Sequence, residues 1–234
     1  MDKIIDLPKS LSKTLTDSDL SSMVVNGVEI GVDRLLADGI IRDIPIISTL
    51  VSIVKTTQSI SNYLSLKKMI SFLNVLADIP IEKRQRMIEK IDTSKKYRNK
   101  VGEQLLFILD HCEDNIKAEY ISFWFKAYIN EEIDYKEFLQ GASVINRITV
   151  EDFQSFIDND SELYHEDSLY IGVGLLFMSM EDVVVKNEVL GDWDDEPTFT
   201  TEGGKLKVYY TNIGEKIRRI FKKRSYIEPR PKTD

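Results

Sequence analysis

The chain has 234 residues, of which 42% are hydrophobic and 30% charged, with only 11 glycines and 6 prolines. This composition excludes a collagen-like, low-complexity or largely disordered polymer, and the length allows one large domain or two small ones. The formal net charge of −8 argues against a molecule that binds polyanions over its whole surface. The single cysteine, Cys112, excludes a disulfide framework within the chain, and the first residues lack a signal-peptide pattern, so we expect a cytoplasmic protein.

In chain order, residues 1–20 are polar and aperiodic, which predicts a loosely ordered arm before the first helix. A helical pattern begins at Asp33 and is interrupted at Pro45. Since proline is tolerated in the first turn of a helix, a new helix is predicted to begin there. Further apolar stripes predict helices over 66–77 and 81–91.

Two helices are predicted in the middle of the chain, over 101–109 and 115–129, and the second is rich in aromatic residues. Two more helix starts follow, each with a capping residue and an acidic residue three positions later, the spacing of a capping box. These pairs are Asp134 with Glu137 and Thr149 with Asp152.

The last third of the chain changes character. The apolar run 168–180 predicts a buried helix, and the β-branched run 182–190 predicts a strand. Residues 191–204 are acidic and contain glycines, which indicates a turn region, and 205–210 alternate like a second strand. A final helix, predicted to follow Thr211, completes the element order of a winged-helix module.

The predicted fold class is therefore mainly α, with an N-terminal helical bundle followed by a winged-helix-like α+β module. Four regions are predicted: an arm and first helix over 1–32, the helical bundle over 33–147, the winged-helix-like module over 148–226 and a tail over 227–234.

Sequence motifs for catalysis and metal binding are incomplete. The acidic turn 158–169 resembles a calcium loop, but Leu163 and Leu169 stand where that loop needs glycine and glutamate. His111 and His165 have no further ligands at metal-binding spacing. No dinucleotide fingerprint, phosphate loop or nucleophile elbow is complete. We expect a protein that is not an enzyme, with no cofactor and no metal.

The predicted module does not have the charges of a DNA-binding protein. Its wing, 192–196, carries four acidic side chains that repel phosphate, so duplex DNA is not an expected partner. Only the last helix is basic. Its outward side chains are predicted to bind an anionic group, belonging to a protein or a nucleotide signal. They are Arg218, Arg219, Lys222 and Lys223.

The segment 44–66 contains one charge, Lys55, in 23 residues. It has two interpretations: a pair of core helices in a soluble bundle, or an amphipathic hairpin that oligomerises or inserts conditionally into the inner membrane. The second interpretation assigns residues to two faces. Ile47, Leu50, Val51 and Val54 would face lipid or another subunit, and Ser48, Ser52 and Lys55 would line a polar pore.

The segment 35–50, LLADGIIRDIPIISTL, resembles a stretch found in uncharacterised bacterial and phage proteins. From 35 to 223 the layout is similar to the abortive-infection alpha family: an apolar helical front, an aromatic middle helix and a closing turn YTNIG at 210–214. The resemblance implies a role in anti-phage defence, in some cases as a membrane-damaging effector. It offers no catalytic motif, so no catalytic residue is carried over.

Two functional hypotheses follow. The first is a non-enzymatic defence effector of the abortive-infection type, a homo-oligomer whose helical front self-associates and perturbs the membrane. The second is a soluble adaptor or regulator that binds a protein or nucleotide partner through its acidic middle and its basic last helix.

Overall fold

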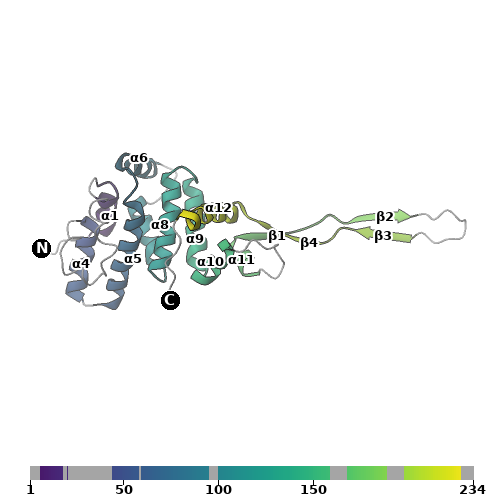
Figure 1. Ribbon diagram of the computed structural model, residues 1–234, viewed down its shortest axis with the longest axis horizontal. Coiled ribbons are helices and arrows are strands. Elements are labelled where there is room, and N and C mark those ends of the chain that lie inside the picture. Colours follow the sequence, from purple (N-terminus) through teal and green to yellow (C-terminus); the bar gives the residue numbers. More distant parts are fainter. Residues whose placement is uncertain are drawn as a thin grey trace, which may run out of the picture. The chain divides into compact units, whose positions relative to one another are not determined.

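The computed structural model describes residues 6–17, 20, 44–57, 59–94, 100–158, 168–188 and 198–227. Within these residues the protein is mainly α, with ten helices and short antiparallel strand pairs near the C-terminus (Figure 1). The chain forms two compact units, Met1–Gln154 and Ser155–Asp234. The division falls within α10 (Val150–Asp158), whereas the sequence predicts a boundary at residue 148.

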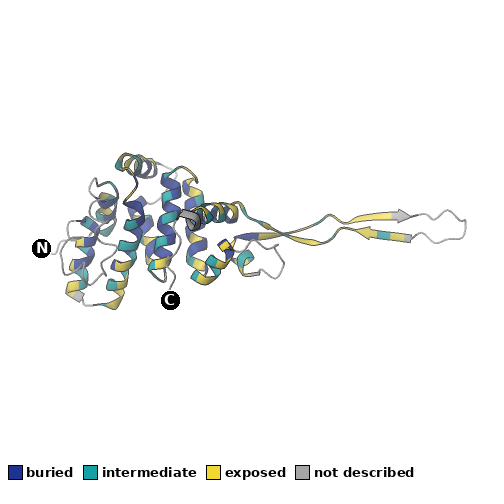
Figure 2. Cartoon of the chain, in the orientation of Figure 1, coloured by how far each residue is buried: buried dark blue, intermediate teal, exposed yellow. Residues whose placement is uncertain are grey.

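The first unit is a helical bundle whose core lies between α5 and α8. Buried segments are concentrated in these helices (Figure 2). The large side chains Phe72, Trp124 and Phe125 are fully buried, as is Phe138 of α9, and the ring centres of Phe125 and Phe138 lie 5.1 Å apart. The predicted helix starts at Pro45, Ile81, Val101 and Asn115 are confirmed. The helices that belong wholly to this unit are α1 (Leu7–Leu15), α4 (Pro45–Thr57), α5 (Ile60–Leu76), α6 (Ile81–Asp92), α7 (Val101–Asp110), α8 (Asn115–Ile129) and α9 (Tyr135–Arg147).

Both predicted caps are present. The Asp134 carboxylate accepts from the Glu137 amide at 2.8 Å, and Glu137 Oε2 accepts from the Asp134 amide at 2.9 Å, which is the full capping box of α9. At the start of α10, Thr149 Oγ1 accepts from the Asp152 amide at 3.1 Å and donates to Asp152 Oδ2 at 2.7 Å. Each cap satisfies an amide that the helix itself leaves free.

The prediction of a loose arm over 1–20 is wrong for residues 7–15, which form α1. Asp6 caps this helix, and Leu11 and Leu15 are fully buried. Two leucines at i, i+4 spacing give one apolar stripe, which is enough to anchor a nine-residue helix on a neighbouring surface. The helix predicted to begin at Asp33 lies outside the described residues.

Arg84 joins α1 to α6 and is only 1% exposed. Its guanidinium donates to three main-chain carbonyls: Ile79 at 3.1 Å, Leu15 at 2.9 Å and Asp17 at 3.0 Å. Burial lowers the pKa of Arg84, an effect that the nearby Asp17 charge opposes. This one side chain therefore satisfies carbonyls both at the end of α1 and in the turn before α6.

The second unit contains α11 (Ser168–Val173), β1 (Leu176–Met180), β2 (Val184–Glu188), β3 (Thr198–Glu202), β4 (Leu206–Tyr210) and α12 (Asn212–Ile227). The predicted helix over 168–180 is wrong beyond residue 173, because Gly174 has φ +88° and the chain then enters β1. The predicted turn 191–204 contains a strand, β3. The predicted strand over 205–210 and the last helix are confirmed, and β2 lies within the predicted strand 182–190.

The start of α12 is fastened to the base of the strands. Thr211 Oγ1 accepts from the Gly214 amide at 3.0 Å and donates to the Gly174 carbonyl at 2.8 Å. A Cβ on Gly214 would lie 2.1 Å from the Leu175 carbonyl oxygen, so only glycine allows this approach. Ile217 and Phe221 of this helix are buried.

Candidate functional site

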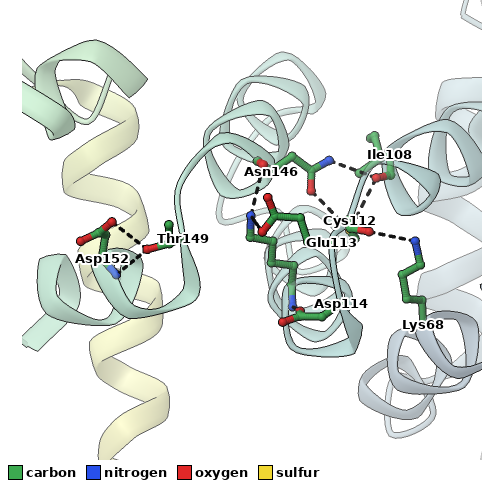
Figure 3. Close-up of polar contacts among 9 residues, drawn as sticks. Lys68, Ile108, Cys112, Glu113, Asp114, Asn146, Thr149 and Asp152 are labelled. Carbon is green, nitrogen blue, oxygen red and sulfur yellow. Dashed lines mark hydrogen bonds and ion pairs between the residues drawn. The ribbon is translucent and has the colours of Figure 1, made fainter. Parts of the chain in front are cut away.

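A polar cluster surrounds the only cysteine, between α5, α7 and α9 (Figure 3). Cys112 Sγ donates to Asn146 Oδ1 at 3.3 Å, and Asn146 Nδ2 donates to the Ile108 carbonyl at 3.0 Å. Lys68 Nζ donates to the Cys112 carbonyl at 2.8 Å. The cluster could not be predicted from the sequence, because each of these three hydrogen bonds joins residues that are 34 or more positions apart.

Lys117 extends the cluster and is only 2% exposed. Its ammonium donates to Glu113 Oε2 at 2.8 Å and to the Asn146 carbonyl at 3.3 Å, and its amide is capped by Asp114 at 2.8 Å. No buried side-chain nitrogen or oxygen of the described residues lacks a hydrogen-bond partner. The contacts of Lys68, Cys112, Lys117 and Asn146 join α5, α7, α8 and α9, so the cluster stabilises the bundle.

Cys112 should resist thiol reagents while the protein is folded. Burial raises the pKa of this thiol to about 12, although Lys68 and Lys117 act in the opposite direction. At pH 8 only about one folded molecule in ten thousand would carry the reactive thiolate. We expect no labelling by iodoacetamide at pH 8 in the time that labels the urea-unfolded chain completely, as measured by intact mass. Rapid labelling of the folded protein would contradict this.

The same shift gives a pH dependence with a definite sign. The pKa of the Cys112 thiol is 9.0 in the unfolded chain and about 12 in the folded one, so the folded state keeps the thiol proton up to a higher pH. The contribution of this thiol to stability is therefore complete below pH 9 and is lost as the pH rises toward 12.

The predicted membrane-facing stripe of α4 belongs to the core. Ile47, Leu50 and Val51 are buried in the first unit and Val54 is half-buried, which favours the interpretation of this segment as a core helix, and contact of these four residues with lipid or another subunit stays a prediction. Helical periodicity identifies an apolar face, but it does not tell which surface covers that face. The predicted pore-lining residues Ser48, Ser52 and Lys55 are exposed on the outside of the unit.

The four basic residues predicted on α12 divide into two groups. The Arg218 guanidinium lies 4.9 Å from the centre of the Tyr210 ring and 5.8 Å from that of Phe156, and it donates to the Tyr210 hydroxyl. It therefore packs within the second unit. Arg219 and Lys223 are exposed and Lys222 is half-buried. Among the described residues, no ion pair joins Arg219 or Lys223 to a carboxylate.

The four strands form one continuous ribbon of two antiparallel chain segments. In β1 and β4, Leu176 pairs with Tyr210 and Met180 with Leu206, and in β2 and β3, Val184 pairs with Glu202. The three-residue gaps 181–183 and 203–205 are equal in length, so one register continues through both pairs. Figure 1 shows β2 and β3 extending in line beyond β1 and β4. At about 3.3 Å per residue, this ribbon arm, residues 176–188 and 198–210, is about 40 Å long.

The ribbon arm is apolar and exposed on both faces (Figure 2). Met180 is 63% exposed, Phe199 62% and Val185 60%. In all, nine large apolar side chains of the arm are exposed: Phe177, Met178, Met180, Val183, Val184, Val185, Phe199, Leu206 and Tyr209. Isolated two-stranded ribbons have marginal stability in water, and contiguous apolar surface is typical of interaction sites. The arm is the strongest candidate for a functional surface.

Sequence analysis does not identify the arm as an exposed surface. The alternation in 205–210 indicates a strand, but the run before Met180 is apolar at nearly every position, which favours burial. The sequence feature that does point to a ribbon is the pair Gly203 and Gly204, since both glycines adopt positive φ in the structure. A Cβ on Gly203 would lie 2.0 Å from the Asp182 carbonyl oxygen, so the strands approach closely at this point.

The described residues hold neither a metal cluster nor a membrane span. No group of three or more His, Cys, Asp or Glu side chains among them is placed to hold a metal ion. Within the same ranges, no helix has the length and apolar character needed to cross a bilayer. The calcium-loop-like turn lies mostly, and His165 and the acidic wing 192–196 wholly, outside the described residues. No family model, curated protein or solved structure matches the chain.

Proposed function

We propose that this chain is a non-enzymatic assembly protein, in which the ribbon arm of one copy binds the second unit of another copy and so joins their helical units. The observation that carries the proposal is the exposure of nine large apolar side chains on a ribbon of only two strands. A ribbon of this kind gains stability when a partner removes its apolar surface from water.

Charge complementarity favours a second copy as the partner. Residues 176–210, which comprise the two segments of the ribbon arm and the sequence that connects them, contain eight acidic and three basic side chains, a net charge of −5, and four of the eight acidic residues lie at 192–196. Residues 212–227 of α12 contain six basic and one acidic side chain, a net charge of +5. The exposed cations Arg219 and Lys223 have no ion-pair partner among the described residues. Two copies related by a twofold axis would each place the net negative stretch 176–210 against the partner's basic helix.

The element order α10, α11, ribbon and α12 supports the interpretation of this region as a winged-helix-like module, and we propose that it is one. The ribbon arm would then be an elongated wing that is used for protein contact. The net negative charge of residues 176–210 disfavours nucleic acid and anionic lipid surfaces, which attract basic wings. The membrane-effector hypothesis would require α4 to expose Ile47, Leu50 and Val51, which are buried, so the described conformation does not favour it.

Sedimentation velocity of the full chain tests the proposal. We expect a dimer at micromolar concentration in 50 mM salt. The double variant M180T/L206T keeps β-forming side chains but removes two exposed apolar contacts, and it should weaken the dimer about 100-fold. The charge-reversed variant R219E/K223E should also dissociate it, because it reverses the attraction to the arm.

A matched control keeps the dimer in the same experiment. Ser179→Thr lies between Met178 and Met180 on the opposite face of β1 and adds no charge. A chain that stays monomeric up to the highest soluble concentration would contradict the proposal. So would a dimer that neither double variant weakens.

A further inference from the structure

The first unit contains a pocket of about 400 Å³ between α1, α4, α5 and α7. Its floor is formed by Leu50, Met69 and Leu109, which are all buried. Its upper walls are less buried and equally apolar: Leu7, Ile53 and Leu106. A volume of this size, with apolar walls and a few polar groups, is typical of sites for small molecules.

One edge of the pocket is polar and comes from a single helix. Asn62, Ser65 and Lys68 follow one another at three-residue spacing along α5, which places them on one side of that helix. The Ser65 hydroxyl donates to the Ser61 carbonyl at 3.0 Å, so its oxygen is available as an acceptor. Apart from Asp110 of α7, the polar groups of the lining are thus gathered on one side of α5, and the remaining lining is mostly aliphatic.

Lys68 supplies a positive charge at this edge. Its ammonium donates to the main-chain carbonyl of Cys112 at 2.8 Å (Figure 3). It also donates to the main-chain carbonyl of Asp110 at 3.2 Å. An ammonium has three hydrogens, so one remains for a further acceptor. Among the described residues no carboxylate lies within ion-pair distance of Lys68, including that of Asp110, which also lines the pocket. The charge of Lys68 is therefore not neutralised by an ion pair there.

The mouth of the pocket carries an exposed aromatic ring. Phe107 is 61% exposed, and its ring lies 4.3 Å from that of His111, centre to centre. A ligand that extends out of the pocket and covers this ring removes its apolar surface from water, which favours binding. This gives three features in order, an apolar floor, a cation at the edge and an aromatic ring at the entrance.

We infer that this pocket binds a small amphipathic carboxylate, with its apolar chain over Leu50, Met69 and Leu109 and its carboxylate on Lys68. The inference goes beyond the proposed function, because the pocket lies in the first unit and uses no residue of the ribbon arm or α12. An ion pair formed at the edge of an apolar pocket is stronger than one formed on an open surface.

Calorimetric titration of the full chain with three probes of equal chain length tests the inference: decanoate, decan-1-ol and decyltrimethylammonium, each below its aggregation limit. We expect decanoate to bind, decan-1-ol to bind at least tenfold more weakly, and the cationic probe not to bind. Equal affinity for the three probes, or no binding of decanoate, would overturn the inference.

Variants distinguish the charge of the pocket from its volume. Lys68→Met should reduce decanoate affinity at least tenfold and leave decan-1-ol unchanged, whereas Leu106→Trp should fill the pocket and weaken both. Lys67→Met is the matched control, because Lys67 is exposed, adjacent in sequence and absent from the pocket lining, and it should bind decanoate like the parent chain. If K67M and K68M reduce decanoate affinity equally, the carboxylate is not held at Lys68 and the inference fails.

Discussion

The variant Arg84→Met is expected to lower the free energy of unfolding by about 3 kcal/mol. Methionine preserves much of the volume but removes all three donors, so the carbonyls of Leu15, Asp17 and Ile79 lose their partner. Each lost hydrogen bond to a charged donor costs about 1.5–3 kcal/mol. The variant also removes the free-energy cost of burying a charged group. The net loss of stability is therefore smaller than the sum of three lost hydrogen bonds.

Urea denaturation followed by far-ultraviolet circular dichroism measures this loss. Arg86→Met is the matched control, since Arg86 lies on the same helix, is exposed and is 3.9 Å from Glu131. Exposed ion pairs contribute about 0–1 kcal/mol, so the control should unfold close to the parent chain. Equal midpoints for R84M and R86M would contradict the role that we assign to Arg84.

The variant Gly141→Ala is expected to destabilise the first unit by about 2–3 kcal/mol. A Cβ at residue 141 would lie 2.2 Å from Trp124 Nε1 and would overlap the indole ring. This ring is fully buried and cannot move aside freely. The indole donates to the Phe138 carbonyl at 3.0 Å, so moving it also lengthens that hydrogen bond. The greater helix propensity of alanine, worth about 1 kcal/mol, offsets only part of this cost.

Gly172→Ala is the control for the same chemical change. Gly172 is also helical, in α11, but a Cβ there would meet no atom within 4 Å. This substitution should therefore be neutral or stabilising by up to about 1 kcal/mol. Thermal unfolding monitored by tryptophan fluorescence and circular dichroism would show the contrast. A loss of stability in G172A that equals the loss in G141A would mean that steric contact with Trp124 is not the cause.

Local signals in the sequence predict the helices of the first unit well. Asp134 and Glu137 form the predicted capping box, and the helix predicted over 115–129 has the observed bounds. These features depend on residues three or four positions apart, which the sequence displays directly. The Lys68 edge of the pocket could not be predicted in this way, because the pocket needs four helices that are far apart in the chain.

Burial is the property that the sequence predicts least well. Ile47 and Met180 are comparable apolar residues in apolar runs, but the first is buried against the bundle and the second stands exposed on a two-stranded ribbon. Periodicity tells which side chains share a face, and only tertiary contacts decide whether anything covers that face. The assignment of α4 to lipid contact and the omission of the arm have this same cause.

Three residues separate β1 from β2 (181–183), and three separate β3 from β4 (203–205). This equality limits which insertions and deletions the gene can accept in the arm. One codon gained or lost between Met180 and Val184 alone would turn every side chain of β2 to the opposite face and break the register that the two strand pairs share. A compensating change among Gly203, Gly204 and Lys205 would restore the pattern. Insertions and deletions between the two strand pairs are therefore tolerated only as matched changes on both strands.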